Sequence, residues 1–252
     1  MGHLDAVSAG ERSAGERSAG ERSAGERSVT VAPLVAVLDY GIGNLRSAQK
    51  GLERVGADAR LTAEPALIEA AAGVVLPGVG AFGRCMEALR DAGLDDLTRR
   101  AVASGRPFMG ICVGMQLLYE GSEEDGGVEG LGILAGTVRR LPVGVKHPQM
   151  QWNVLRRLRP SVLLAGLADP VWMYFVHSFA PDFTDPSVAA HAVAVCDYGA
   201  EVVAAVERDN VSAAQFHPEK SAANGLAVLA NFVAGCERAS ARCAGAAPAP
   251  AP

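Results

Sequence analysis

The sequence lacks long hydrophobic runs and has no strong excess of either charge. Its longest apolar runs, such as residues 73–77 and 188–196, are much shorter than a membrane span. No charged-then-apolar signal segment opens the chain, so we expect a cytosolic protein without a membrane partner. The formal net charge of −5 gives no indication of a nucleic-acid partner.

The sequence also lacks paired cysteines. Five cysteines are present, odd in number and widely spaced, and none belongs to a C-x-x-C pair; they are Cys85, Cys112, Cys196, Cys236 and Cys243. Because cytosolic cysteines are normally reduced, we expect free thiols rather than disulfides. The spacing indicates neither a zinc site nor a redox motif, and we predict no metal and no other cofactor.

The 252 residues divide into three parts. Residues 1–30 carry four copies of Ser-Ala-Gly-Glu-Arg, which offer no large apolar side chain to a core, so we expect a disordered repeat tail. Residues 243–252 are rich in alanine and proline and predict a second disordered tail. The folded domain is therefore expected at residues 31–242.

Strands and helices alternate in the first half of this domain. Buried strands are predicted at residues 34–39, 73–76 and 107–111, and helices at residues 45–55, 86–103 and 115–119. Alternation of this kind predicts an α/β fold, in which a mostly parallel central sheet has helices on both faces. Ligands of such folds gather at the carboxyl ends of the strands.

The second half lacks long helices between its apolar runs. Short strand-like segments are predicted at residues 130–141, 171–179, 190–196, 202–206 and 213–216, followed by a closing helix at residues 225–236. We therefore expect additional antiparallel strands in this half.

A cysteine lies where a buried strand is predicted to meet a helix. The segment Gly110-Ile111-Cys112-Val113-Gly114 has a glycine two residues before and two residues after Cys112. The same spacing around serine forms the nucleophile elbow of hydrolases, and N–H groups at the start of the helix would stabilise both a thiolate and an oxyanion. The alternative is that Cys112 is simply a small buried residue, which we prefer for the other four cysteines.

A His-Pro-Glu triplet follows the last predicted strand. His217 can serve as a base near neutral pH, and Glu219, two residues later, can orient its ring. The triplet alone is more typical of a surface loop, so its significance comes from its combination with Cys112.

Two glycine-containing loops follow buried strands. Gly78, Val79 and Gly80 could bring a backbone N–H close to a substrate as a second oxyanion donor opposite the Val113 N–H, or could form only a tight turn. Residues 39–44 are similar to a phosphate loop only in part, because the third glycine and the lysine of such loops are absent.

Together these segments resemble the class I glutamine amidotransferases, and within them the glutaminase subunit (HisH) family of imidazole glycerol phosphate synthase, from histidine biosynthesis. The resemblance rests on five segments in order, which are DYGIGNLRS at 39–47, LPGVGAF at 76–82, GICVGMQ at 110–116, YFVHSF at 174–179 and QFHPEKS at 215–221. The cysteine and His-x-Glu segments are typical of the class, whereas the first and fourth segments and the closing Lys-Ser point to this subunit. The resemblance implies a flavodoxin-like domain.

By this resemblance Cys112 attacks the side-chain amide of glutamine, His217 protonates the departing ammonia, and water then hydrolyses a glutamyl thioester, with Glu219 behind His217. The resemblance implies that the oxyanion and the substrate are held by Gly78, Val79, Gly80, Val113, Gln116, His177, Ser178 and Phe179. It also implies a heterodimer with a cyclase subunit of (βα)8-barrel form, which uses the ammonia to make imidazole glycerol phosphate and aminoimidazole carboxamide ribotide.

One segment departs from the pattern of that family. Where Pro-His-Met-Gly-Trp-Asn is usual, residues 148–153 read Pro-Gln-Met-Gln-Trp-Asn. Gln149 cannot titrate as histidine would, and Gln151 adds a side chain where glycine left space.

Three alternative functions share these residues. The ammonia could serve another pathway, since the Cys-His-Glu triad is common to the whole class. The chain could instead be a catalytically uncoupled regulatory subunit, or a cysteine hydrolase that acts alone on another amide.

Overall fold

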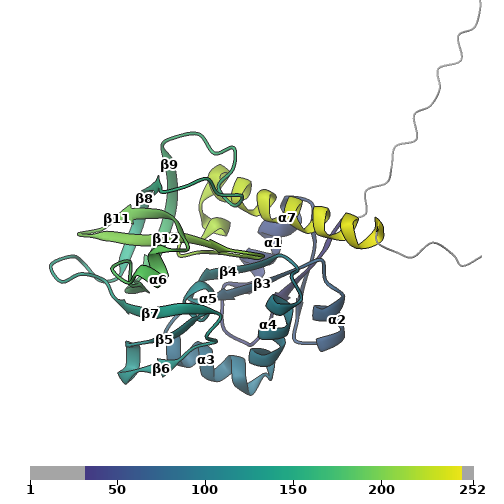
Figure 1. The fold of residues 1–252 in the computed structure, drawn as a ribbon, viewed down its shortest axis with the longest axis horizontal. Helices are drawn as coiled ribbons and strands as arrows, with labels where there is room; N and C mark the ends of the chain where they lie inside the picture. The colour runs from purple at the N-terminus through teal and green to yellow at the C-terminus, as the bar shows by residue number, and fades with distance from the viewer. Residues whose placement is uncertain (1–31, 246–252) are drawn as a thin grey trace, which may run out of the picture. The chain divides into compact units, whose positions relative to one another are not determined.

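A nine-stranded sheet forms the centre of the fold in residues 32–245, the part of the chain that the computed structural model describes (Figure 1). Its strand order is β2-β1-β3-β4-β13-β12-β11-β8-β9. The first five of these pair in parallel and comprise β1 (Leu34–Leu38), β2 (Asp58–Thr62), β3 (Gly73–Gly78), β4 (Phe108–Cys112) and β13 (Val211–Ala214). This half confirms the predicted α/β architecture.

The remaining strands of the large sheet pair antiparallel, as expected for the second half. They are β8 (Gln149–Arg157), β9 (Val171–His177), β11 (Ala192–Asp197) and β12 (Glu201–Arg208). A second sheet has the order β10-β7-β5-β6 and comprises β5 (Tyr119–Ser122), β6 (Val128–Glu129), β7 (Leu134–Arg140) and β10 (Phe179–Pro181). Strand β13 connects the parallel and antiparallel parts of the large sheet, because it is parallel to β4 and antiparallel to β12.

Helices cover both faces of the parallel strands. Those described are α1 (Leu45–Arg54), α2 (Pro65–Ala70), α3 (Phe82–Asp91), α4 (Leu94–Ala103), α5 (Val113–Gln116), α6 (Pro186–Ala189) and α7 (Ala222–Gly245), with short 3-10 turns η1 (Glu124–Gly126) and η2 (Pro218–Lys220). Figure 1 shows α1 beside α7 on one side of the sheet and α3 beside α4 on the other. Within residues 32–245 we find no helix with the length and apolar character that crossing a bilayer requires.

The core lies between the parallel strands and these helices. Every residue of β3 and β4 is buried, and burial of an apolar run on both faces is what a covered parallel sheet requires. These two central strands are in register, with Gly78 opposite Cys112. Their carboxyl ends therefore bring the two predicted oxyanion segments together at one edge.

Three predicted helix boundaries were wrong. The helix predicted at residues 86–103 is two helices, α3 and α4. Gly93 lies between them in a left-handed conformation with φ 66°, which ends the first helix. The helix after Cys112 begins at Val113 rather than at residue 115, and Tyr119 already starts a strand. The closing helix α7 is longer than predicted and continues through Gly245, into the segment expected to be a tail. Strands β2, β5, β6 and β8 and the short helices α2 and α6 were not predicted.

The start of α7 depends on a close backbone contact that predicts a stability effect. A Cβ at Gly225 would lie 1.9 Å from the Pro218 carbonyl oxygen, whereas a Cβ at Gly235 in the same helix would come no nearer than 3.8 Å to the Arg238 side chain. We expect Gly225→Ala to lower the free energy of unfolding by about 1–3 kcal/mol through overpacking. Gly235→Ala, the matched control, should raise it by up to about 1 kcal/mol through helix propensity.

Urea unfolding of the two variants beside the parent measures both effects. Equal stability of Gly225→Ala and the parent would contradict the close approach of α7 to η2.

Candidate active site

Cys112 lies at a strained turn between β4 and α5. Its backbone has φ 55° and ψ −114°, values that a residue with a side chain rarely adopts. The turn raises Cys112 at the carboxyl end of the central strand, directly before the first N–H groups of α5. The geometry is that of a nucleophile elbow, as the glycine spacing predicted.

The two glycines that flank Cys112 are required by close packing of backbones. A Cβ at Gly114 would lie 1.8 Å from the Leu76 carbonyl oxygen, and a Cβ at Gly110 would lie 2.9 Å from the Gly114 carbonyl oxygen. A Cβ at Gly78, on the neighbouring strand, would lie 2.7 Å from the Gly114 backbone nitrogen. Strands β3 and β4 and helix α5 can therefore meet only with glycine at these three positions.

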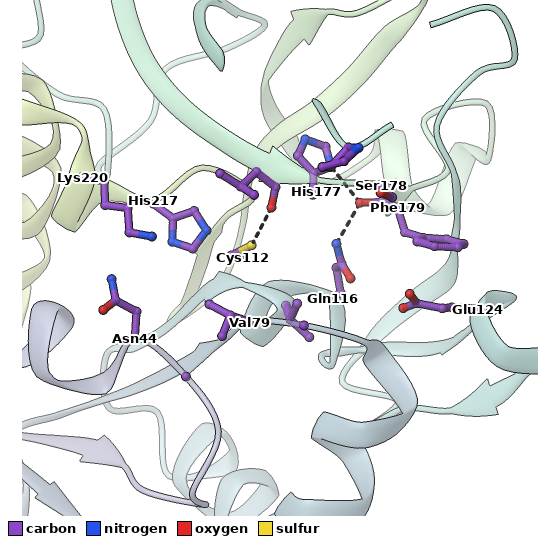
Figure 2. Close-up of a pocket in the computed structure, with 15 residues that line it drawn as sticks. Asn44, Val79, Cys112, Gln116, Glu124, His177, Ser178, Phe179, His217 and Lys220 are labelled. Atoms are coloured by element: carbon purple, nitrogen blue, oxygen red, sulfur yellow. Dashed lines mark hydrogen bonds between the residues drawn. The ribbon is translucent and has the colours of Figure 1, made fainter. Parts of the chain in front are cut away.

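The His217 and Glu219 side chains form a buried pair beside Cys112. The His217 Nδ1 lies 2.8 Å from the Glu219 Oε1, and both side chains are almost inaccessible to solvent. Asn44, at the start of α1, donates its Nδ2–H to the same Glu219 oxygen at 3.1 Å. Figure 2 shows the His217 ring beside the Cys112 sulfur, so the order is Cys112, His217, Glu219, Asn44.

His217 and Glu219 stabilise each other's charged forms. Burial lowers the pKa of His217, but the adjacent Cys112 and Glu219 outweigh it and raise the pKa of His217 to about 10. Burial likewise raises the pKa of Glu219, but interactions with His217 and Asn44 outweigh it and hold the pKa below its ordinary value. Near neutral pH the arrangement therefore favours an imidazolium held by a carboxylate, a state that stabilises a nearby thiolate.

The Cys112 sulfur has two further polar contacts. The Val176 carbonyl oxygen lies 3.7 Å away and the Gln215 Nε2 lies 3.8 Å away. Both Cys112 and Gln215 are buried, so these contacts are made in a poorly solvated environment.

A pocket of about 540 Å³ opens in front of Cys112 (Figure 2). It is lined by Gly43, Asn44, Val79, Gly80, Cys112, Val113, Gln116, Glu124, Pro148, Val176, His177, Ser178, Phe179, His217 and Lys220. Of the residues predicted from sequence, only Gly78 and Glu219 do not line it. Gly78 packs beneath the elbow and Glu219 lies behind His217, so the structure brings the whole predicted set together.

The wall opposite the elbow is organised by one carbonyl group. The Phe179 carbonyl oxygen accepts hydrogen bonds from the His177 Nδ1 and from the Gln116 Nε2, each at 2.8 Å (Figure 2). Because a carbonyl can only accept, His177 carries its proton on Nδ1. Burial lowers the pKa of His177 to about 4, so this histidine is neutral at physiological pH.

Several pocket residues were not predicted from the sequence to belong to the site. Asn44 lies in the loop compared above with a phosphate loop, yet its observed partner is a carboxylate. Glu124 lines the far end of the pocket and accepts a hydrogen bond from the Phe82 backbone N–H at 2.8 Å. Lys220 and Pro148 also line the pocket, and only their presence in the quoted sequence segments connected them with it.

The two departures from the family pattern have different environments. Gln149 is completely buried at the start of β8, opposite His177 in the antiparallel pair, with its Nε2 3.8 Å from the Cys196 sulfur. Gln151 is exposed on the same strand, so its added side chain causes no packing conflict.

The described side chains indicate no metal centre. Among them, no group of three or more His, Cys, Asp or Glu residues is arranged to hold an ion.

Comparisons with known proteins agree with one another. The family described as "Glutamine amidotransferase class-I" matches residues 36–236. The "Imidazole glycerol phosphate synthase subunit HisH" of Methanothermobacter thermautotrophicus is 48% identical over 200 residues, covering 79% of this chain and 98% of that protein. The protein of the same description from Synechococcus elongatus is 49% identical over 205 residues, covering 80% of this chain and 93% of that protein.

Solved structures show likeness of fold alone. PurLQS from Thermotoga maritima superposes with a TM-score of 0.63 at 18% identity, covering 81% of this chain and 98% of that chain. A crystal structure described as a glutamine amidotransferase gives the same TM-score at 21% identity, covering 80% of this chain and 98% of that chain.

The pKa values of the two buried histidines are shifted in opposite directions. NMR of histidine labelled with ¹⁵N should find His217 protonated through pH 8, because its pKa is raised to about 10. His177 should stay neutral, with its proton on Nδ1, down to about pH 5, because its pKa is lowered to about 4. Titration of both rings near the ordinary histidine pKa would contradict this arrangement.

Proposed function

The chain belongs to the class-I glutamine amidotransferases and, within them, to the HisH subunits of imidazole glycerol phosphate synthase, and from this premise we propose how its residues release ammonia from glutamine. Cys112 is the nucleophile, His217 is the acid and base, and Glu219 orients His217. The observation that carries the proposal is the strained elbow, which presents Cys112 to the buried His217–Glu219 pair at the floor of a pocket.

The reaction follows from the charges of this group. The thiolate of Cys112 attacks the amide carbon of the glutamine side chain, and a tetrahedral oxyanion forms. His217, as imidazolium, gives its proton to the nitrogen, the C–N bond breaks, and ammonia departs from a glutamyl thioester. Water then gives a proton to His217 and attacks the thioester, which releases glutamate and restores the thiolate–imidazolium pair.

We propose that the pocket walls hold the oxyanion and the substrate. Val113, at the start of α5, lines the pocket together with Val79 and Gly80, and Gly78 lies opposite Cys112 in the sheet. Backbone N–H groups of these two segments would supply the oxyanion donors. Gln116, and the wall formed by His177, Ser178 and Phe179, would hold the remaining groups of glutamine. None of these roles requires a cofactor.

We propose that the class-I amidotransferase domain comprises residues 31–242 and that the tails, residues 1–30 and 243–252, take no part in catalysis. A cytosolic location is supported by the free cysteines among the described side chains.

Replacing the nucleophile tests the chemical proposal. We expect Cys112→Ala to lower glutamate release from glutamine by about 10³-fold or more, since removal of a nucleophile eliminates the covalent pathway. Cys236→Ala is the matched control, because Cys236 is a buried cysteine on α7 that does not line the pocket, and it should retain the parent rate. The assay measures glutamate from the purified chain with its cyclase partner present. Parent-like activity of a folded Cys112→Ala would contradict the proposal.

The partner subunit would dock on the face of β8 and β9 that continues from the pocket. Opposite residues of an antiparallel pair share a face, so Met150, Trp152 and Trp172 lie on the same face as Val176, which lines the pocket. These three large apolar side chains are 62%, 44% and 47% exposed. An exposed apolar patch beside the pocket is what a docking surface requires. We propose that the (βα)8-barrel cyclase covers it as a heterodimer and receives the ammonia there, making imidazole glycerol phosphate and aminoimidazole carboxamide ribotide.

Removing one side chain of this patch should weaken docking. We expect Trp152→Ser to weaken binding of the cyclase subunit from the same organism by roughly tenfold or more, as measured by titration calorimetry, because large aromatic residues dominate interface energies. Val162→Ser is the control, since Val162 is also exposed but lies outside the patch, beside another cavity. Equal affinity of the Trp152 variant and the parent would show that the partner docks elsewhere. Absence of binding by the parent would favour an acceptor from another pathway.

A further inference from the structure

Gln215 makes a contact with the nucleophile that the reaction scheme above does not use. It follows β13, two residues before His217, and its side chain is completely buried. Its Nε2 lies 3.8 Å from the Cys112 sulfur, within the range of hydrogen bonds to sulfur, and its Oε1 accepts a hydrogen bond from the Gln116 Nε2 at 3.0 Å. The amide thus links Cys112 to Gln116, and through Gln116 to the Phe179 carbonyl on the opposite wall of the pocket.

The orientation of this amide is determined by a chain of donors and acceptors. The Phe179 carbonyl can only accept, so Gln116 must direct its NH2 group toward it. The second N–H of Gln116 then requires an acceptor, which is the Gln215 Oε1. With its oxygen so occupied, Gln215 must direct its own NH2 group at Cys112. Reversing the Gln215 amide would place two NH2 groups against each other.

The two polar neighbours of the sulfur have opposite effects on its ionisation. The Val176 carbonyl oxygen can interact favourably only with the S–H of a thiol. The Gln215 N–H can donate to either form, but a hydrogen bond to a charged acceptor is stronger, so it favours the thiolate. Burial amplifies this difference because little water competes.

We propose that Gln215 is a positioning residue for the glutaminase reaction, one that favours the Cys112 thiolate by donating an amide N–H to its sulfur and is itself oriented by Gln116. The proposal rests on the function proposed above.

Other titratable groups also face the sulfur. His217 from the loop after β13, Tyr40 after β1 and Cys85 on α3 interact electrostatically with Cys112, and Glu124 and Lys220 line the same pocket. A substitution at Gln215 changes none of these charges, so the effect of its amide can be measured separately.

The pH dependence of Cys112 alkylation tests the proposal. Iodoacetamide reacts with the thiolate, and mass spectrometry of the peptide that contains Cys112 reports that site alone. We expect Gln215→Leu and Gln215→Met, neither of which can donate, to move the midpoint of the alkylation profile up by about one pH unit, equivalent to about tenfold slower alkylation below the midpoint. The Met variant retains the length and volume of Gln215 and so preserves packing if the Leu variant does not fold.

Gln49 provides a control for loss of a side-chain amide. Gln49, on α1 and outside the pocket, donates its amide N–H to the Ala59 carbonyl of β2, so Gln49→Leu should leave the profile unchanged. A parent-like midpoint in a folded Gln215 variant would overturn the proposal, as would a uniform fall in rate without a shift, because that result indicates a structural role alone. Glutamine hydrolysis by the parent is measured beside these profiles. A shift in the variants with no hydrolysis by the parent would count against the proposed function and support the role of Gln215.

Discussion

The site depends on one packing constraint, which is the close approach of three backbones beneath Cys112. Strands β3 and β4 and helix α5 meet where Gly78, Gly110 and Gly114 lie, with room for a Cβ at none of the three. This contact holds Cys112 in its positive-φ conformation, which costs of order 1–3 kcal/mol and persists only when the surrounding structure enforces it. The buried, apolar central strands provide that enforcement.

Rigid packing also explains how the polar groups are held without being exposed to water. The second half of the chain contributes β9 and β10, which form the pocket wall opposite the elbow. It also contributes the loop after β13, which brings both His217 and Gln215 to the Cys112 sulfur. The Phe179 carbonyl orients His177 and Gln116. The Glu219 carboxylate orients His217, and Gln116 in turn orients Gln215. The result is a site that is organised before substrate binds, which is the condition for strong electrostatic stabilisation of a transition state.

Much of this arrangement could be predicted from local sequence. The glycine spacing around Cys112 and the two-residue step from His217 to Glu219 describe short-range geometry, and the structure contains both. Strand β8 was missed although residues 149–154 alternate polar and apolar side chains. Its burial is the reverse of the usual pattern, because Gln149 is buried whereas Met150 and Trp152 are exposed. The break at Gly93 was missed because glycine within an apolar periodic segment has several compatible conformations.

Long-range polar contacts were beyond the reach of sequence patterns. Asn44 and Glu219 are separated by 175 positions, and Gln215 and Cys112 by 103, so no local spacing connects them. These contacts exist only because the parallel strands bring their carboxyl ends to one edge of the sheet. Sequence patterns therefore identify the candidate groups for the chemistry, and the fold determines which groups orient them.

Trapping the covalent intermediate tests the proposed role of Cys112 as nucleophile most directly. The protein and its cyclase partner are mixed with glutamine, quenched in acid within one turnover, digested and analysed by mass spectrometry. We expect a glutamyl group on the peptide that contains Cys112 and on no other. Consumption of glutamine with no such adduct, or with the adduct on a different residue, would contradict that role.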